Sequence, residues 1–331
     1  MNEPLRGVYM DNKTISFTAA NSIPVKIFKN RMLVDDLNDG YIPPIHVQLI
    51  PTNKCNLNCS FCSCKKRNKT EELTLKQIET LCRDLKKMGC EAATITGGGE
   101  PLMHKDISGI LQCLSDYDIK IGLVTNGFLL DKLNTWDLKN VTWCRISCAD
   151  ERQFDILDPK IVATIEKNKN VDWAFSYVLS KFPDVANLIK YIRFANNHKF
   201  THVRVVSDLL DLDNVTSMDN IKKLIDCDDS LVIYQGRKSF DPGQKDCRIS
   251  LLKPVIGADG FIYPCCGVQY AHQSEDLDNP ESMRMGRIED IVDIYKKQKF
   301  FNGLQCYRCY YKNYNDILGQ MVGEMGHLEF V

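Results

Sequence analysis

The feature that most constrains the fold is a regular alternation of strand-like and helical segments through the first two thirds of the chain. Strand-like runs occur at 45–50, 92–96, 119–125, 141–147, 172–180 and 202–207, and helical patterns lie between them at 73–89, 107–117, 128–138, 158–169 and 184–198. Such alternation favours parallel strands joined by right-handed crossovers. Because six repeats fall short of the eight that close a full barrel, we predict a partial (β/α)6 barrel in the α/β class.

The two ends of the chain depart from this pattern. Residues 1–43 form a leader, in which SIPVKIFKNRML is expected to give a short hairpin, and residues 44–227 hold the barrel. Residues 228–331 are predicted to contain a linker over 228–245 and then a small domain, with a hairpin turning at Asp259–Gly260 and a helix near 287–299. This domain has few apolar residues in a regular pattern, so we expect a bound metal centre to stabilise it.

The amino-acid composition indicates in which cellular compartment the protein works and which partners it does not bind. The 331 residues include 42 Lys+Arg and 43 Asp+Glu, and this balance does not indicate a broad nucleic-acid surface. The sequence has neither a signal-peptide pattern nor an apolar run long enough to span a membrane. We therefore predict a cytoplasmic protein without a membrane partner. In that reducing compartment, 15 cysteines indicate metal binding or redox chemistry rather than disulfides.

A first cysteine cluster follows the first predicted strand. Cys55, Cys59 and Cys62 stand in the pattern C-x3-C-x2-C, in a loop at the strand's carboxyl end, where the active sites of parallel α/β folds lie. Four thiolates normally hold a [4Fe–4S] cluster, so three from one loop would leave one iron open to an outside molecule. A structural zinc site with one ligand from elsewhere is the alternative. Cys64 lies outside the pattern and is expected to be a bystander thiol.

The cysteine loop and a glycine motif together resemble the radical S-adenosylmethionine (SAM) superfamily. The hallmark C-x3-C-x-aromatic-C of that family appears here with Phe61 as its aromatic residue. A second hallmark, a GGE after strand two, appears within TITGGGEP as Gly98, Gly99 and Glu100, followed by Pro101. The resemblance covers the predicted barrel, and it implies a [4Fe–4S] cluster whose open iron chelates SAM.

The resemblance also implies roles for single residues. Phe61 would lie against the adenine of SAM, and the glycine motif would receive its amino group, since glycines let a ligand approach the backbone. Asn126 and Ser147, at the ends of predicted strands three and four, would contact the ribose or carboxylate of SAM. A turn or helix-cap role is equally open for both. An external electron donor such as ferredoxin or flavodoxin would supply the electron that cleaves SAM.

A second set of cysteines lies in the last third of the chain. The hairpin GADGFIYPCC, the segment MGRIEDI and a C-x2-C pair resemble the SPASM and twitch extensions of radical SAM enzymes, and five cysteines match the one-cluster twitch form best. The resemblance implies an auxiliary [4Fe–4S] cluster held by Cys247, Cys265, Cys306 and Cys309. Zinc in a ribbon-like knuckle is the alternative.

Cys266 is left over beside a predicted ligand. In one group of twitch-bearing peptide epimerases, the second cysteine of a similar YPCC donates a hydrogen atom to the substrate radical. The resemblance therefore implies that role for Cys266 as one alternative. Which of Cys265 and Cys266 binds the auxiliary cluster stays open.

These features predict a radical SAM oxidoreductase or modifying enzyme. Reductive cleavage of SAM would give a 5′-deoxyadenosyl radical that removes a hydrogen atom from a peptide or a sugar-like small molecule, with the auxiliary cluster aiding the reaction. Three alternatives stay open. They are epimerisation with Cys266 as hydrogen donor, nucleotide or nucleic-acid modification aided by the basic run CKKRNK, and a metal-stabilised binding protein without catalysis.

Overall fold

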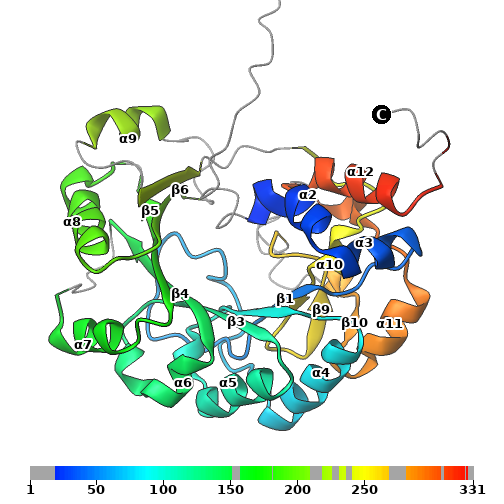
Figure 1. Ribbon diagram of the computed structural model, residues 1–331, viewed down its shortest axis with the longest axis horizontal. Helices are drawn as coiled ribbons and strands as arrows, with labels where there is room; N and C mark the ends of the chain where they lie inside the picture. The colour runs from blue at the N-terminus through cyan, green and yellow to red at the C-terminus, as the bar shows by residue number, and fades with distance from the viewer. Residues whose placement is uncertain are drawn as a thin grey trace, which may run out of the picture.

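The computed structural model describes residues 19–150, 157–180, 182–208, 218–225, 231–235, 241–267, 281–306, 309–324 and 326. In this part of the chain, ten strands form a sheet in the order β10-β9-β8-β1-β2-β3-β4-β5-β6-β7. The sheet bends into an open arc, and helices cover its outer side (Figure 1).

Seven neighbouring strands, β1 to β7, pair in parallel. They are β1 (His46–Leu49), β2 (Ala92–Ile95), β3 (Lys120–Thr125), β4 (Val141–Ala149), β5 (Asp172–Leu179), β6 (His202–Ser207) and β7 (Val232–Gln235). The helices between them include α4 (Leu75–Lys87), α5 (Ile107–Asp116), α6 (Thr135–Lys139), α7 (Pro159–Lys167), α8 (Val185–Asn197) and α9 (Met218–Leu224). The predicted α/β partial barrel is confirmed, and β7 extends it within the segment predicted to be a linker.

Helix α4 shows how single residues determine where a helix begins and ends. Thr74 caps it, because its side chain accepts a hydrogen bond from the backbone N–H of Gln77 while the Gln77 side chain accepts one from the N–H of Thr74. Ile78 and Leu85 are buried among the residues that face the sheet. The helix stops before Gly89, whose φ of 91° is a left-handed conformation that favours glycine.

The helix predicted over 128–138 is wrong in its extent. The structure has a short 3-10 turn (Leu130–Lys132) and then the separate helix α6. Asn134 interrupts the pattern because it forms a capping box with Asp137, in which each side chain accepts from the other's backbone N–H at 3.0 Å. A cap of this kind starts a new helix rather than continuing an old one.

The hairpin predicted in the leader is also wrong. The segment folds as α2 (Ala19–Lys29) and α3 (Arg31–Asn38). Leu33 and Leu37 are buried one helical turn apart, and the Asn30 side chain caps α3 by accepting from the N–H of Leu33 at 3.2 Å. The periodicity of a short apolar run does not distinguish a strand from a helix. In this segment the burial of one helical face favours the helix.

The carboxyl-terminal segment joins the same sheet. The predicted hairpin is present as β8 (Val255–Ile256) and β9 (Phe261–Tyr263), and β8 pairs in parallel with β1. The predicted helix near 287–299 appears as α11 (Ile291–Lys297). This segment also contains α10 (Ile249–Leu252), β10 (Gly286–Arg287) and α12 (Lys312–Met321).

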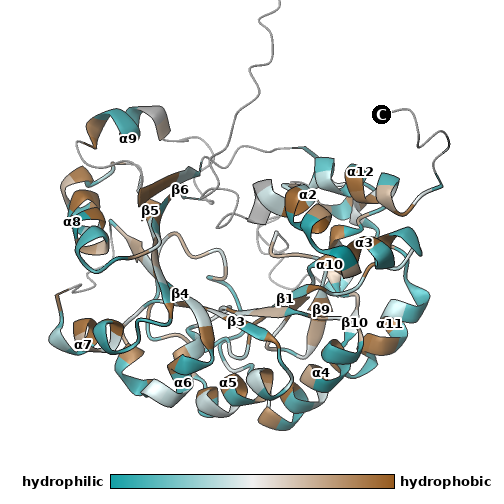
Figure 2. Ribbon diagram, in the orientation of Figure 1, coloured by the Kyte–Doolittle hydropathy of each residue, from teal (hydrophilic) through white to brown (hydrophobic). Residues whose placement is uncertain are grey.

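The strands of the arc present two different faces. On β5, the Phe175 ring lies 5.1 Å from the ring of Tyr191 on α8, so this face packs against the outer helices. Its neighbour Ser176 points to the opposite, concave face, because successive strand residues alternate. Figure 2 shows hydrophobic residues along β5 and β6, and a mixture of hydrophobic and hydrophilic residues on the outer helices. No helix within the described ranges is long and apolar enough to cross a membrane.

The cap of α4 gives a testable prediction for the fold. Replacing Thr74 by Ala removes the N-cap hydrogen bond and is expected to lower the free energy of unfolding by about 1 kcal/mol, measured by urea unfolding. Thr80→Ala on the same helix is the control, because its hydroxyl bonds only to the Lys76 carbonyl one turn back. If Thr80→Ala lowered the free energy of unfolding as much as Thr74→Ala, the capping role of Thr74 would be contradicted.

Candidate functional site

The first cysteine cluster lies at the carboxyl end of β1, as predicted. Cys55, Cys59 and Cys62 are all half-buried in the loop that leads from β1 to α4. The backbone N–H of Leu57 donates to Cys55 Sγ at 3.4 Å, and the Arg67 guanidinium donates to Cys62 Sγ at 3.6 Å. Donors of this kind stabilise a thiolate, which is the form of cysteine that binds metal.

The glycine motif after β2 is pressed against this loop. A Cβ atom on Gly98 would lie 1.8 Å from Asn53 Oδ1, and one on Gly99 would lie 1.9 Å from the Lys54 carbonyl oxygen. The backbone N–H of Glu100 donates to that same Lys54 carbonyl at 2.8 Å. Only glycine fits at these two positions, so the motif fixes the start of the cysteine loop.

Glu100 ties three segments together. Its carboxylate is 2% exposed and accepts hydrogen bonds from the Leu102 N–H at 3.1 Å, the Thr125 hydroxyl at 2.7 Å and the Asn126 N–H at 2.7 Å. The Asn126 side-chain amide in turn donates to Asn56 Oδ1, in the cysteine loop, at 2.7 Å. Glu100 and Asn126 therefore position the loops, and their predicted contacts with SAM stay predictions.

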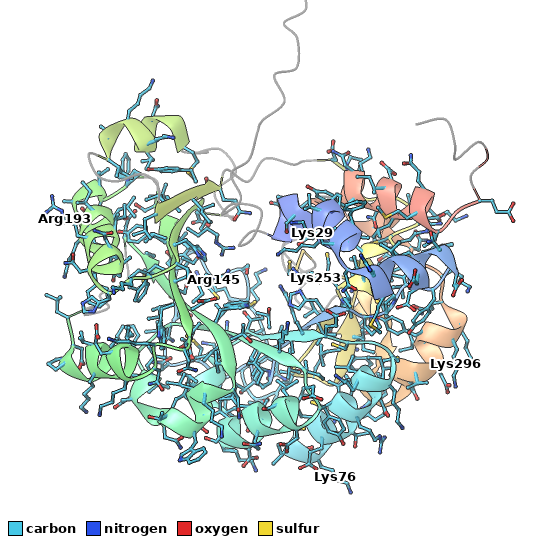
Figure 3. All side chains as sticks on the ribbon, viewed as in Figure 1. Lys29, Lys76, Arg145, Arg193, Lys253 and Lys296 are labelled. Carbon is cyan, nitrogen blue, oxygen red and sulfur yellow. The ribbon has the colours of Figure 1, made fainter. Side chains whose placement is uncertain are left out.

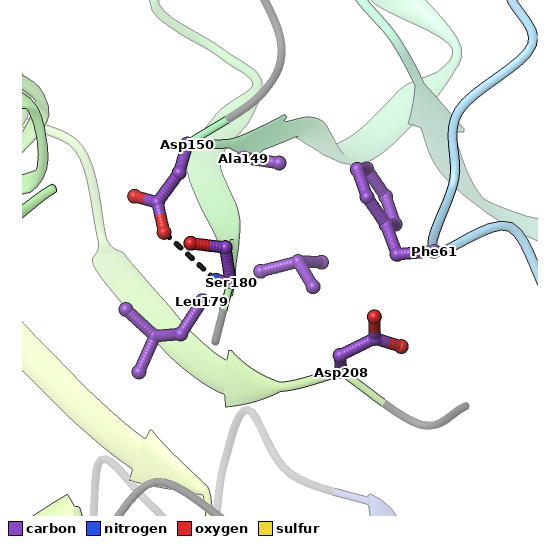
Figure 4. A pocket seen from close by; sticks show the side chains of 7 residues that line it. Phe61, Ala149, Asp150, Leu179, Ser180 and Asp208 are labelled. Carbon is purple, nitrogen blue, oxygen red and sulfur yellow. Dashed lines mark hydrogen bonds between the residues drawn. The ribbon is translucent and has the colours of Figure 1, made fainter. Parts of the chain in front are cut away.

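Phe61 faces the carboxyl ends of β4, β5 and β6 across a small cavity (Figure 4). The other residues that line the cavity are Ala149, Asp150, Val178, Leu179, Ser180 and Asp208. Asp150 is held in place because it accepts from the Tyr177 hydroxyl at 2.6 Å and the Ser180 N–H at 2.7 Å. An aromatic ring opposite carboxylate oxygens offers stacking for a base and acceptors for sugar hydroxyls.

The sequence analysis did not identify Asp150 or Asp208. Each directly follows a strand, Asp150 after β4 and Asp208 after β6, and polar residues at the carboxyl ends of parallel strands are the signal that finds them. The predicted residue Ser147 is on the concave face of β4, in register with Ser176 of β5. It does not belong to the cavity lining around Phe61.

The cysteine loop brings three thiols to one end of the sheet. Across the residues that the structure describes, no three Cys, His, Asp or Glu side chains converge as the ligands of one metal ion do. In a cubane, each cysteine binds a different iron, so its sulfurs need not meet at one point.

Cys64 has a different environment from the three motif cysteines. Its thiol donates to the Gly97 carbonyl at 3.9 Å. Burial, with a smaller contribution from the neighbouring Cys62, raises the pKa of Cys64 to about 12. A thiol that bonds to a backbone carbonyl suits the predicted bystander.

The second cysteine set is also gathered in space. Burial, together with the nearby thiols Cys247 and Cys309, raises the pKa of Cys306 to about 12. Burial likewise raises the pKa of Cys265, with contributions from Cys266 and Cys247. Thiolates this close repel one another, and a cationic metal centre would remove that repulsion. The four predicted ligands therefore lie near one another, and their binding of a common centre stays a prediction.

Backbone contacts hold this second site. Cys247 pairs with Phe301 through two backbone hydrogen bonds of 2.9 and 3.0 Å. The Gly243 N–H donates to the Cys306 carbonyl at 2.7 Å, and the Asn315 side-chain amide donates to Cys247 Sγ at 3.8 Å. Cys266 is set apart from the predicted ligands by its own contact, with its sulfur 3.7 Å from the Tyr311 hydroxyl.

Residues 49–147 match the family model of the radical SAM superfamily. GTP 3′,8-cyclase of Haemophilus influenzae (strain PittGG) is 31% identical over 147 residues, which are 42% of this chain and 41% of that protein. The chain thus spans less than half the length of that relative. GTP 3′,8-cyclase of Campylobacter jejuni (strain RM1221) is 25% identical over 290 residues, covering 76% of this chain and 88% of that protein.

Solved structures share the fold at low sequence identity. Streptococcus suis SuiB bound to S-adenosylmethionine has a TM-score of 0.58 and 18% identity, over 86% of this chain and 73% of that one. Native anSMEcpe with bound AdoMet and Kp18Cys peptide has a TM-score of 0.54 and 14% identity, over 78% and 82% of the two chains. Together, the family match over residues 49–147, the parallel fold and the cysteine loop identify a radical SAM domain in this chain.

The Glu100 network gives a testable prediction. Glu100→Gln places an amide donor where a carboxylate oxygen now accepts from a backbone N–H or a hydroxyl. It is expected to lower the free energy of unfolding by about 1–3 kcal/mol, measured by urea unfolding. Glu79→Gln, exposed on α4, is the control and should change this free energy by less than about 0.5 kcal/mol. Equal effects in the two variants would refute the role of Glu100.

Proposed function

We propose that this chain reductively cleaves SAM and uses the resulting radical to remove a hydrogen atom from a substrate. The observation that supports this most is the meeting of three motif features at one end of the sheet. Cys55, Cys59 and Cys62 lie beside the glycine motif, and Phe61 faces the ends of β4 to β6. When bound, a [4Fe–4S] cluster with one open iron supplies the electron for SAM cleavage.

The chain's own residues have distinct parts in this proposal. The three motif cysteines hold the first cluster, and the glycine motif, which fixes the start of their loop, receives the amino group of SAM. Phe61 stacks on the adenine, and Asp150 and Asp208 offer carboxylate oxygens near the ribose hydroxyls. The reactive intermediate would lie on the concave side of the sheet, where contact with water is reduced.

The second cysteine set is proposed to hold one auxiliary [4Fe–4S] cluster through Cys247, Cys265, Cys306 and Cys309. Their mutual proximity and burial support this assignment. A cluster with four protein ligands has no open iron, so it suits electron transfer or substrate positioning. Ferredoxin or flavodoxin is the proposed external donor for the first cluster.

The proposed substrate is a peptide or a sugar-like small molecule. The relatives named GTP 3′,8-cyclase favour a nucleotide as the second candidate, because one of them aligns with 76% of this chain. Epimerisation is a further variant of the reaction. The half-buried Cys266, beside the Tyr311 hydroxyl, would donate the hydrogen atom in that case.

Iron binding tests the ligand assignment. Anaerobically reconstituted protein is expected to hold about eight irons per chain, which corresponds to two cubanes. Cys59→Ser should lose about half of the iron and of the visible absorbance, because the first cluster loses one of its three thiolates. The control Cys64→Ser should keep both, since Cys64 bonds to the Gly97 carbonyl. Iron loss in Cys64→Ser with retention in Cys59→Ser would overturn the assignment.

SAM cleavage tests the function itself. With SAM and dithionite, the reconstituted protein is expected to form 5′-deoxyadenosine, detected by chromatography, and Cys59→Ser should form none above background. Cys266→Ser distinguishes epimerisation from the other proposed reactions. It should leave 5′-deoxyadenosine formation intact, and only an epimerase would then lose its product. Iron-loaded protein that never consumes SAM would refute the proposal.

A further inference from the structure

Asp150, which lines the cavity opposite Phe61, has a donor on each of its two oxygens. The Tyr177 hydroxyl donates to Oδ1 at 2.6 Å, and the Ser180 backbone N–H donates to Oδ2 at 2.7 Å, the contact drawn in Figure 4. Within the described part of the chain, no other donor reaches this carboxylate. Because each carboxylate oxygen can accept about two hydrogen bonds, each keeps an acceptor position for a ligand.

Tyr177 reaches Asp150 from the helix layer outside the sheet. Its side chain is fully buried, and its ring lies 5.4 Å from the ring of Tyr191 on α8. The register of β4 and β5 pairs Tyr177 with Cys148, just before Asp150 in the chain. Tyr177 is not among the described residues that line the cavity. Its hydroxyl therefore meets the carboxylate where β4 ends, without entering the cavity.

Asn187, in the first turn of α8, sets the direction of the Tyr177 hydroxyl. Its side-chain amide donates to the Tyr177 oxygen at 2.8 Å, and its own backbone N–H donates to the helix-capping residue Asp184 at 2.9 Å. Because an ionised carboxylate can only accept, the Tyr177 proton points to Asp150. Burial, with a further contribution from Asp150, raises the pKa of Tyr177, which keeps this proton in place.

We propose that Tyr177 and Asn187 are positioning residues that act through Asp150 on the binding of the SAM ribose. This inference rests on the proposed function, which places Asp150 near the ribose hydroxyls. Donors on both oxygens hinder rotation of the carboxylate and leave one acceptor position of each oxygen for a ligand in the cavity. A vicinal diol has two donors, one for each oxygen. Ordering the carboxylate before the ligand arrives lowers the entropic cost of binding.

Binding of S-adenosylhomocysteine tests the positioning role. This ligand lacks the sulfonium of SAM and is therefore not cleaved, so its affinity for reconstituted protein is measured by anaerobic calorimetry. Tyr177→Phe is expected to weaken binding about threefold to tenfold, because Asp150 loses one of its two donors. The affinity for the 2′,3′-dideoxy analogue should not change, since that ligand has no hydroxyls for Asp150. Equal losses for both ligands, or no loss for either, would refute the role.

Combining Tyr177→Phe with Asp150→Asn distinguishes positioning from a general loss of structure. If Tyr177 acts through Asp150, the double variant should bind S-adenosylhomocysteine no more weakly than Asp150→Asn alone. Losses that add in the double variant would overturn the proposal. With SAM and dithionite, Tyr177→Phe should raise the KM for SAM and leave kcat within about twofold of the wild type, as a loss of binding alone predicts.

Asn187→Ala tests the second positioning residue, and it also serves if Tyr177→Phe folds poorly. It keeps the Tyr177 hydroxyl and removes its orienting donor, so a loss of about twofold to threefold in affinity is expected. Unchanged affinity would overturn the role of Asn187. Arg193→Ala is the matched control, because Arg193 is exposed on the outer side of the same helix (Figure 3). Tyr41→Phe removes a hydroxyl that donates to the Met88 carbonyl at 3.3 Å, outside the site. Neither control should change the affinity.

The outcome is separable from the fate of the proposed function. Iron content and circular dichroism equal to those of the wild type show that each variant is folded and loaded, and 5′-deoxyadenosine formation is measured on the same preparations. SAM cleavage with additive losses refutes the positioning role and keeps the enzyme. Non-additive losses in iron-loaded protein that never cleaves SAM keep the positioning role and refute the proposed function.

Discussion

One buried carboxylate holds the site together. A buried charge is costly unless its oxygens are hydrogen-bonded, and Glu100 meets this requirement with donors from its own turn and from the end of β3. The Asn126 amide then carries the connection to Asn56, in the cysteine loop. The ends of β2 and β3 and the loop after β1 must therefore keep their relative positions for the charge to stay satisfied. The geometry of the three motif cysteines depends on this network.

Much of the fold could be predicted because the barrel strands differ from the helices in both length and period. The six predicted strands end within two residues of the observed ones. The leader could not be predicted this way, since the apolar residues around Ile27 and Leu33 fit either period until a neighbouring surface buries one face. β7 was missed because four residues give no periodic signal.

The residues of the candidate site also divide into those that the sequence predicts and those that it does not. The cysteines, Phe61 and the glycines are close in sequence and form motifs, so the resemblance to a family was enough to single them out. Asp150 and Asp208 meet Phe61 only because β4 and β6 end at the same edge of the sheet. Convergence of this kind depends on topology, which single-sequence patterns do not contain.

The parallel pairing of β8 with β1 has a consequence for how the molecule is made. β1 carries the first cysteine loop, yet one of its two edges is covered by β8, which the ribosome adds after β2 to β7. Until then, that edge offers open backbone donors and acceptors to any other strand. The strand that carries the first cysteine loop is thus fully paired only after all the other parallel strands of the arc have been synthesised.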